Sequence, residues 1–293
     1  MSGGGSGEPT LDPEVVITRS GAKAIRDRIC GELMHPVVGP RVEAARLYLE
    51  PSRLRARLAS AQQPLVLFDV GLGAGSNAIA AWQASEARTS GAPLHIVSFD
   101  RSTDAMAMAL RPEHAAAFGF EGEAAVAARA VLEHGRHQTE RTHWNVVVGD
   151  LFTTLADSPR EHADIVYWDP FSPGANPTLW STEAFAALRG CCRSGVTVHT
   201  YGGATSSRAA LLLAGFVVGE GPLIAPVLAE AADAAPKKAA GAKRSTIAAL
   251  RIEDLERPLD RRWLERLERS SAPLPKGAPP DALDRIRGLA QFD

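Results

Sequence analysis

The stretch DVGLGAGSNAIAAW, residues 69–82, sets three glycines at alternate positions between a short apolar run and an apolar stretch of helical character. Because glycine has no side chain, it allows tight turns and a close approach of the backbone to a ligand. The preceding run, PLVLFDV at 64–70, has the continuous apolar character of a strand buried on both faces. The pattern predicts a strand, a glycine loop and a helix, an arrangement that holds nucleoside-type cofactors. The alternative is that the glycines serve only a tight turn.

Two cofactor classes use such a loop. A dinucleotide site has the pattern G-x-G-x-x-G/A, in which Ser76 would take the third small position. The other pattern is an acid followed by G-x-G-x-G, which surrounds the amino-acid part and the ribose of S-adenosylmethionine. Asp69, Gly71, Gly73 and Gly75 match it without a mismatch. The carboxylate of Asp69 can take the ammonium of that ligand, directly or through water. These residues favour S-adenosylmethionine as the cofactor.

Further runs of strand character follow the glycine loop and alternate with helix candidates. They lie at 94–100, 144–150, 163–169, 195–201, 216–221 and 245–252. Strands that alternate with helices are typical of a parallel sheet covered by helices on both faces. The sequence therefore predicts an α/β fold with a doubly wound, mostly parallel, seven-stranded sheet of Rossmann-like type.

Acidic residues stand at the ends of several of these strands. The carboxyl ends of parallel strands form the edge at which such sheets bind ligands, so we expect the acids in one crevice. Asp100 can accept hydrogen bonds from both hydroxyls of an adenosine ribose, and Asp150 would lie beside the adenine. Asp169 ends the strand that abuts the first one, and the prolines of DPFSP at 169–173 order the loop that follows it.

The two ends of the chain differ in composition from its centre. We expect a flexible tail at 1–12, an N-terminal extension at 13–62, the main domain at 63–252 and a C-terminal helical tail at 253–293. In the extension, EVVITRSG and ARLYLEPS suggest a hairpin around a loop that contains His35. His35, Glu43 and Tyr48 could touch a substrate, but a structural role is favoured for each.

Composition excludes several classes of protein. With 293 residues, 45% hydrophobic and 23% charged, the chain resembles an ordinary globular protein, and its net charge of −2 does not indicate nucleic-acid binding. The three cysteines have no CxxC spacing, so neither a disulfide framework nor a metal site is expected. We see no signal peptide and no apolar run of membrane-spanning length, so we expect a cytoplasmic protein without a membrane partner.

Four stretches together resemble a known family: DVGLGAGSN, GDLFTTL, DIVYWDPFSPGANPTLWSTEAF and GVTVHTYGGATSSRAALLLAGFVV. Their order and spacing are similar to the methyltransferase domain of the MnmC-type tRNA-modifying proteins, which also occurs alone as MnmD. The family pattern D-G-F-[AS]-P-x-x-N-P-x-[ML]-W is matched except at Pro170, where the family has glycine. The resemblance covers roughly 65–225. Proline removes a backbone donor and fixes φ beside Asp169.

The resemblance implies a class I fold that binds S-adenosylmethionine and methylates the amine of 5-aminomethyl-2-thiouridine at the tRNA wobble position. Asp169 would be the base, and Asn77 would join the cofactor site. We expect the flavin-dependent oxidoreductase half of the bifunctional proteins to be a separate partner, and tRNA to be the substrate. The residues expected at the substrate are Phe171, Ser172, Pro173, Arg208, Lys243 and Arg244.

Less specific interpretations stay open beside this one. Asp169 could simply cap the following turn, and the basic run at 237–244 could be a solvated surface segment. Trp180 is expected to be a core anchor and not a base-stacking platform. Another amine or small molecule could be the acceptor, or the chain could be a non-catalytic cofactor- or RNA-binding module. A nicotinamide oxidoreductase is disfavoured by Asp69 and Ser76.

Overall fold

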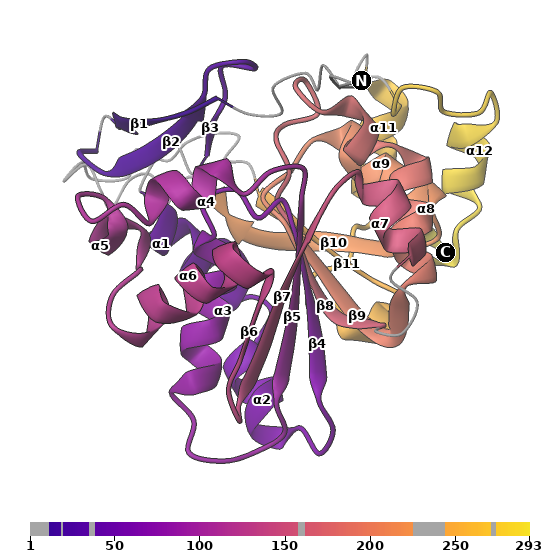
Figure 1. The fold of residues 1–293 in the computed structure, drawn as a ribbon. Coiled ribbons are helices and arrows are strands. Elements are labelled where there is room, and N and C mark those ends of the chain that lie inside the picture. The colour runs from indigo at the N-terminus through magenta and orange to yellow at the C-terminus, as the bar shows by residue number, and fades with distance from the viewer. Residues whose placement is uncertain (1–11, 19, 35–38, 158–161, 225–243, 271–273) are drawn as a thin grey trace, which may run out of the picture.

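The computed structural model describes residues 12–18, 20–34, 39–157, 162–224, 244–270 and 274–293. Its centre is an eight-stranded sheet with the strand order β10-β11-β9-β8-β4-β5-β7-β6 (Figure 1). The strands are β4 (Leu65–Val70), β5 (Leu94–Asp100), β6 (Arg136–Gln138), β7 (Thr142–Val148), β8 (Ala163–Trp168), β9 (Cys192–Thr200), β10 (Val217–Leu223) and β11 (Arg244–Ala249). The strand order reverses between β4 and β8, which is the point at which doubly wound sheets bind ligands.

The five central strands are parallel, as predicted. β4 pairs with β5 and β8, β5 with β7, and β8 with β9, all in parallel register. β11 is antiparallel to both β9 and β10. The predicted count of seven strands is wrong, because β6 adds an antiparallel edge strand to β7. Its three residues, RHQ, have no apolar pattern that could indicate a strand.

Helices cover both faces of the sheet. One face carries η1 (Ala44–Leu49), α2 (Leu54–Ser60), α3 (Ser76–Glu86), α4 (Asp104–Ala109), α5 (Ala115–Phe118) and α6 (Glu123–His134). The other carries α7 (Leu151–Asp157), α8 (Thr182–Gly190), α9 (Thr205–Leu213), α11 (Arg261–Arg269) and α12 (Ala282–Arg287). The result is the three-layer arrangement of an α/β fold (Figure 1).

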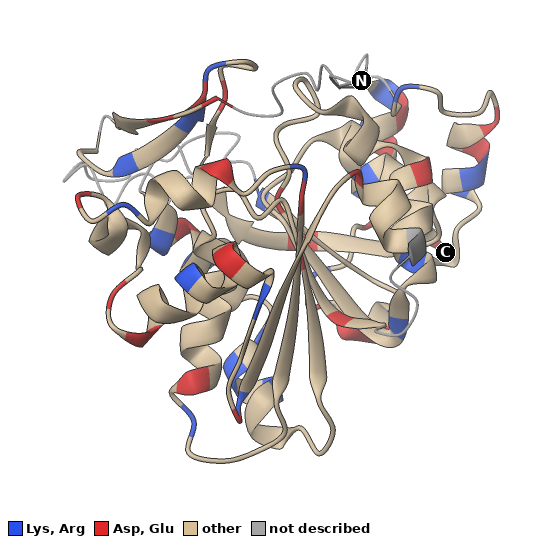
Figure 2. Ribbon diagram, viewed as in Figure 1, with Lys and Arg blue, Asp and Glu red and all other residues tan. Residues whose placement is uncertain are grey.

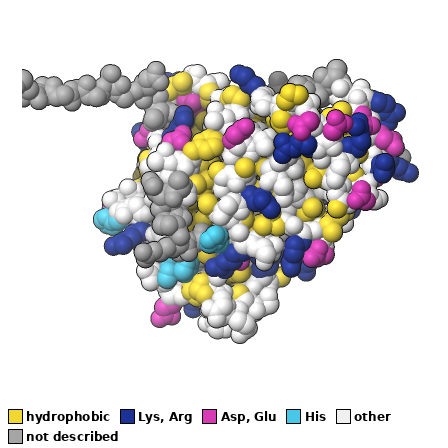
Figure 3. Space-filling view, turned by 90° about the vertical axis from the view of Figure 1, so that its right-hand side faces the viewer, with side chains coloured by type: hydrophobic (Ala, Val, Ile, Leu, Met, Phe, Trp, Pro, Cys, Tyr) yellow, Lys and Arg dark blue, Asp and Glu magenta, His cyan; other side chains and the backbone are white. Residues whose placement is uncertain are grey.

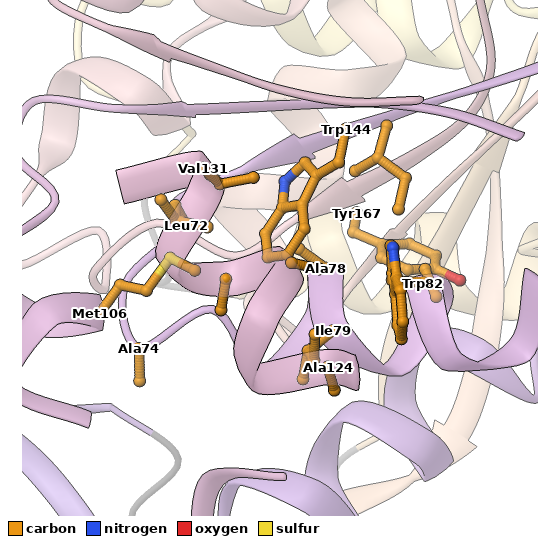
Figure 4. Packing of buried hydrophobic residues seen from close by; sticks show 14 of the residues in the cluster. Leu72, Ala74, Ala78, Ile79, Trp82, Met106, Ala124, Val131, Trp144 and Tyr167 are labelled. Atoms are coloured by element: carbon orange, nitrogen blue, oxygen red, sulfur yellow. The ribbon is translucent and has the colours of Figure 1, made fainter. Parts of the chain in front are cut away.

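Successive strand residues point to opposite faces, so each apolar strand contributes side chains to the core on both faces of the sheet. In β4, Leu67 joins the cluster beneath α3, whereas Val66 and Phe68 join the cluster beneath α8 and α9. Figure 4 shows Trp144 and Tyr167 packed in the first cluster with residues of the glycine loop and α3. Charged residues are sparse along the central strands and frequent on the outer helices and loops (Figure 2). The central strands are buried on both faces, which explains why they are nearly continuous apolar runs.

The N-terminal segment forms a separate small sheet. β1 (Pro13–Ile17), β2 (Lys23–Asp27) and β3 (Leu33–Met34) pair in that order, and all pairs are antiparallel. The expected hairpin between EVVITRSG and ARLYLEPS is wrong, because residues 44–49 form the π-helix η1 after the short helix α1 (Pro40–Glu43). In η1, Leu47, Tyr48 and Leu49 are buried on the sheet face. His35 lies outside the described residues.

The C-terminal segment packs on the sheet and covers its edge. Trp263, Leu264 and Leu267 of α11 lie in the core cluster with Ile286 of α12. Gln291 exchanges two hydrogen bonds with the backbone of Val218 in β10, at 2.8 and 2.6 Å. Edge strands covered in this way have no unpaired backbone to attract other strands.

On the side of the molecule turned toward the viewer in Figure 3, basic and acidic side chains are interspersed.

Candidate active site

A cavity of about 810 Å³ opens at the carboxyl ends of β4, β5, β7 and β8. The loops that follow these strands form one wall, and the N-terminal sheet, α1 and η1 supply the opposite one. Its volume falls within the range of small-molecule and cofactor sites. The glycine loop and the three acids predicted at the strand ends therefore meet at one place.

Gly71 and Gly73 shape the floor of the cavity. Gly71 has φ +90°, and a Cβ there would lie 2.6 Å from the carbonyl oxygen of Asp169. Gly73 has φ +50° and donates its N–H to the carboxylate of Asp100 at 2.9 Å. Gly75 does not line the cavity. The space that a side chain at this position would need is taken by Phe120 and Met106. The structure thus places Gly75, which was predicted at the cofactor, behind the cavity wall.

Asp100 and Asp150 both line the cavity. Asp100 accepts from the amides of Gly73 and Arg101 at 2.9 and 2.7 Å. Burial raises the pKa of Asp100, although these amides act in the opposite direction. Asp150 accepts from the amide of Phe152 at the start of α7, and its other oxygen lies 3.4 Å from the guanidinium of Arg101. Both carboxylates are thus fixed by backbone before any ligand arrives.

Asp69 lies beneath the cavity and not on its wall. Its carboxylate is fully buried and accepts from the hydroxyl of Ser98 at 2.8 Å, and that hydroxyl in turn accepts from the indole of Trp144 at 3.1 Å. Its side chain points from β4 toward the α3 face, as the register with Ser98 requires. The sequence predicted that Asp69 takes the ammonium of the ligand directly or through water, and its full burial is against the direct contact.

Asp169 lies in the cavity, held between two side chains. Its Oδ1 accepts from the hydroxyl of Tyr48 at 2.6 Å, and its Oδ2 accepts from the amide of Asn77 at 2.7 Å. Asn77, which was predicted at the cofactor, is buried, does not line the cavity and contacts Asp169. Both carboxylate oxygens are anchored, as in a group held for binding or catalysis.

The loop after Asp169 is fixed by contacts at both ends. Of the three residues of this loop that were predicted at the substrate, Phe171 and Ser172 line the cavity and Pro173 does not. Glu32 accepts from the amide of Ser172 at 2.8 Å and also from its hydroxyl. Trp180, in the 3₁₀ helix η2 (Pro177–Trp180), is buried and donates to the carbonyl of Phe171 at 2.8 Å. Trp180 is a core anchor, as predicted.

The basic residues predicted at the substrate do not reach this cavity. Arg208 is 6% exposed, donates to Thr246 at 3.0 Å and lies 3.7 Å from Glu220. It is a structural residue between α9 and β11. Arg244 pairs with Glu220 at 3.4 Å and borders a second cavity, of about 1180 Å³, beside β9, β10 and β11. Lys243 and most of the 237–244 run lie outside the described residues.

Three residues at the cavity were missed or undervalued in the sequence. Tyr48 was expected to be structural, and it contacts Asp169 directly. Tyr201 follows β9 and donates its hydroxyl to the carbonyl of Pro170 at 3.0 Å. Its place at a strand end is a signal that could have found it. Glu32 precedes the two-residue strand β3, and no sequence signal marks it.

The cavity carries a strongly negative set of side chains. Among the described residues, its lining includes six carboxylates and one arginine: Asp27, Glu32, Glu43, Asp100, Asp150 and Asp169, with Arg101. Like charges close together in a site of restricted solvent access disfavour an anionic ligand. A pyrophosphate would be repelled here, whereas a ligand with cationic groups would be attracted. S-adenosylmethionine, with its sulfonium and ammonium, fits the charge of these residues.

The chain is similar in sequence and in fold to known proteins. Residues 123–226 match the family model of S-adenosyl-L-methionine-dependent methyltransferases. The chain is 33% identical over 190 residues to the tRNA 5-methylaminomethyl-2-thiouridine biosynthesis bifunctional protein MnmC of Pseudomonas entomophila, covering 61% of this chain and 29% of that protein. The MnmC of Paraburkholderia xenovorans is 30% identical over 194 residues, covering 63% and 29%. The chain thus spans less than a third of the length of these relatives.

The crystal structure of MNMC2 from Aquifex aeolicus has the same fold, with a TM-score of 0.70 and 20% identity over 95% of this chain and 86% of that one. Together with the family match, the fold and the site define the class of protein: an S-adenosylmethionine-dependent methyltransferase of the class I fold. Within this class, the aligned segments of the chain are similar in sequence to MnmC proteins.

No helix in the described ranges is long and apolar enough to cross a membrane. No group of three or more His, Cys, Asp or Glu side chains among those residues is arranged to hold a metal ion.

Proposed function

We propose that this chain methylates the aminomethyl nitrogen of 5-aminomethyl-2-thiouridine at the wobble position of tRNA, with S-adenosylmethionine as methyl donor. The observation that carries the proposal is the Asp169 carboxylate, anchored through both oxygens at the wall of an acidic cavity. The name of the MnmC relatives contains the methylated product of this reaction. An amine acceptor also suits the charge of the cavity, because a primary aliphatic amine is cationic near neutral pH.

The chemistry requires little more than deprotonation and alignment. S-adenosylmethionine supplies a methyl group on a positively charged sulfur. The amine nitrogen forms a bond to the methyl carbon while the carbon–sulfur bond breaks, and the electron pair of that bond stays on sulfur. Asp169 orients the amine and takes or relays its proton, because the nitrogen needs its lone pair to attack. Alignment of the reacting atoms supplies about 7–11 kcal/mol in well-oriented reactions.

The substrate and partner follow from the same proposal. The bifunctional relatives are more than three times as long as the segment they share with this chain, since that segment is 29% of their length. We propose that a separate flavin-dependent oxidoreductase produces the aminomethyl group on which this chain acts. The tRNA backbone would bind outside the acidic cavity, so that only the modified base enters it.

Methyl transfer to tRNA tests the proposal directly. The full chain is incubated with labelled S-adenosylmethionine and tRNA from cells that lack the endogenous methylation step. We expect label in the modified uridine and, in calorimetry, binding of S-adenosylhomocysteine but not of NAD. Methylation of a different amine would replace the substrate, and cofactor binding without transfer to any amine would support a binding module instead. Binding of NAD without binding of S-adenosylhomocysteine would overturn the assignment of S-adenosylmethionine as the cofactor.

A further inference from the structure

The carboxylate of Asp169 is held by residues from two distant parts of the chain. Tyr48 belongs to η1, 121 positions earlier, and Asn77 belongs to α3, 92 positions earlier. One donates to Oδ1 and the other to Oδ2, so rotation of the carboxylate about the Cβ–Cγ bond would break both hydrogen bonds. Hydrogen bonds to an ionised group are about twice as strong as those between neutral groups. The orientation of Asp169 is therefore set by these two donors.

The environment of Tyr48 keeps its hydroxyl protonated and directs the proton into the hydrogen bond to Asp169. The side chain is 1% exposed, and its ring packs against Tyr167 with 5.4 Å between centroids. Burial, together with the charge of Asp169, raises the pKa of Tyr48 well above its usual value, so the phenol stays protonated. The hydroxyl oxygen accepts from the amide of Tyr201 at 3.3 Å, which leaves its single proton for the 2.6 Å bond to Asp169.

The same contacts connect Tyr48 to the unusual Pro170. The proline has no amide hydrogen, and its carbonyl accepts from the hydroxyl of Tyr201. Tyr201 thus bonds the loop one residue beyond Asp169, and its own amide bonds Tyr48. In this way η1 and the end of β9 together hold the start of the loop.

We propose that Tyr48 is a positioning residue for methyl transfer, which orients the Asp169 carboxylate toward the acceptor amine. The inference rests on the proposed function, since it needs an acceptor that uses Asp169. A carboxylate oxygen can accept more than one hydrogen bond, so the anchored group can still receive the amine. Tyr48 acts through Asp169 and does not exchange a proton with the substrate.

Tyr48→Phe removes the hydroxyl and keeps the ring. Misplacement of a reacting group by about 1 Å costs on the order of a hundredfold in rate, so we expect kcat to fall roughly 10- to 100-fold. The dissociation constant of S-adenosylhomocysteine and the thermal midpoint should change little. The matched control is Tyr167→Phe, which removes an equally buried hydroxyl that bonds Ser52 at 2.9 Å and does not line the cavity.

A double-mutant cycle separates positioning from a general structural role. If Tyr48 acts through Asp169, the effect of Tyr48→Phe on kcat disappears when Asp169 is already Asn. A purely structural Tyr48 would lower kcat by the same factor in both backgrounds, and that result would overturn the inference. So would a Tyr48→Phe variant with unchanged kcat. Failure of the wild-type chain to methylate any amine would instead refute the proposed function.

Discussion

Asp169 combines two properties that bear on its role. It lies on the wall of a ligand cavity, and both its oxygens are bonded to side chains of the protein. A residue that only capped a turn would use its oxygens on nearby backbone amides. The bonds from Tyr48 and Asn77 support a role at the acceptor, and the test of that role is kinetic.

Asp169→Asn keeps the size of the side chain and removes its charge and basicity. We expect turnover to fall by about 10²–10⁴, the usual range for loss of a general base. The affinity for S-adenosylhomocysteine should stay within about twofold, because the glycine loop and Asp100 are untouched. Calorimetry and single-turnover methylation measure the two quantities. Parallel losses of affinity and turnover would assign Asp169 to cofactor binding instead.

Asp100 is the residue that we expect to recognise the cofactor ribose. Asp100→Asn should weaken S-adenosylhomocysteine binding roughly 10- to 100-fold, because a hydrogen bond to a charged group contributes about 1.5–3 kcal/mol. Burial raises the pKa of Asp100, which means that burying the ionised carboxylate lowers the stability of the fold. Asn relieves the cost of burying that charge but can accept only one of the two backbone hydrogen bonds from Gly73 and Arg101; these effects oppose each other, so the thermal midpoint without ligand should change little. A large drop in that midpoint with unchanged affinity would make Asp100 a structural residue.

At the scale of elements, the glycine loop and the loop after β8 fit against each other. Gly71 contacts the backbone of Asp169 and Pro170 so closely that no side chain can be placed between them. The sequence predicted a close approach of Gly71 to a ligand. The structure shows that its close approach is to the loop that carries the candidate catalytic acid. One glycine thereby sets the distance between the cofactor loop and Asp169.

Gly71→Ala should disturb both loops. The substitution meets an unfavourable φ of +90° and a backbone atom at 2.6 Å, whereas Gly277→Ala meets a similar φ of +80° in open space. Both should lower stability, because alanine is strained at positive φ. Only Gly71→Ala should also weaken S-adenosylhomocysteine binding. The dissociation constant should rise about tenfold for each 1.4 kcal/mol that the distorted loop takes from the binding free energy. Equal effects of the two variants on binding would contradict the packing role.

At the scale of the whole molecule, buried polar groups make the fold sensitive to acid. His199 in β9 is 1% exposed, and no hydrogen-bond partner for its Nδ1 lies among the described residues. Burial, with a smaller contribution from the charge of Arg57, lowers the pKa of His199 from 6.5 to about 3. The unfolded chain therefore binds a proton near pH 6.5 that the folded chain binds only near pH 3. Stability is lost as the pH falls through this window.

His199→Gln should make the fold less sensitive to acid. The wild type is expected to lose roughly 1.4 kcal/mol of unfolding free energy per pH unit through His199 between pH 6.5 and 3. Urea unfolding at pH 7 and pH 5 should show a difference smaller by about 2 kcal/mol in the variant. The control is His162→Gln, which replaces an exposed histidine. An unchanged difference in His199→Gln would show that other groups cause the acid sensitivity.

The sequence by itself determined the fold class and the edge of the sheet that binds ligands. Apolar runs, the glycine loop and acids at strand ends are local signals, and their order defines a doubly wound sheet. Only the tertiary structure decided which side chains meet. Asp69 is buried because strand register turns it toward α3, and Tyr48 and Asn77 reach Asp169 across separations of 121 and 92 residues. Such contacts depend on how elements that are distant in sequence pack together, and no local pattern encodes that packing.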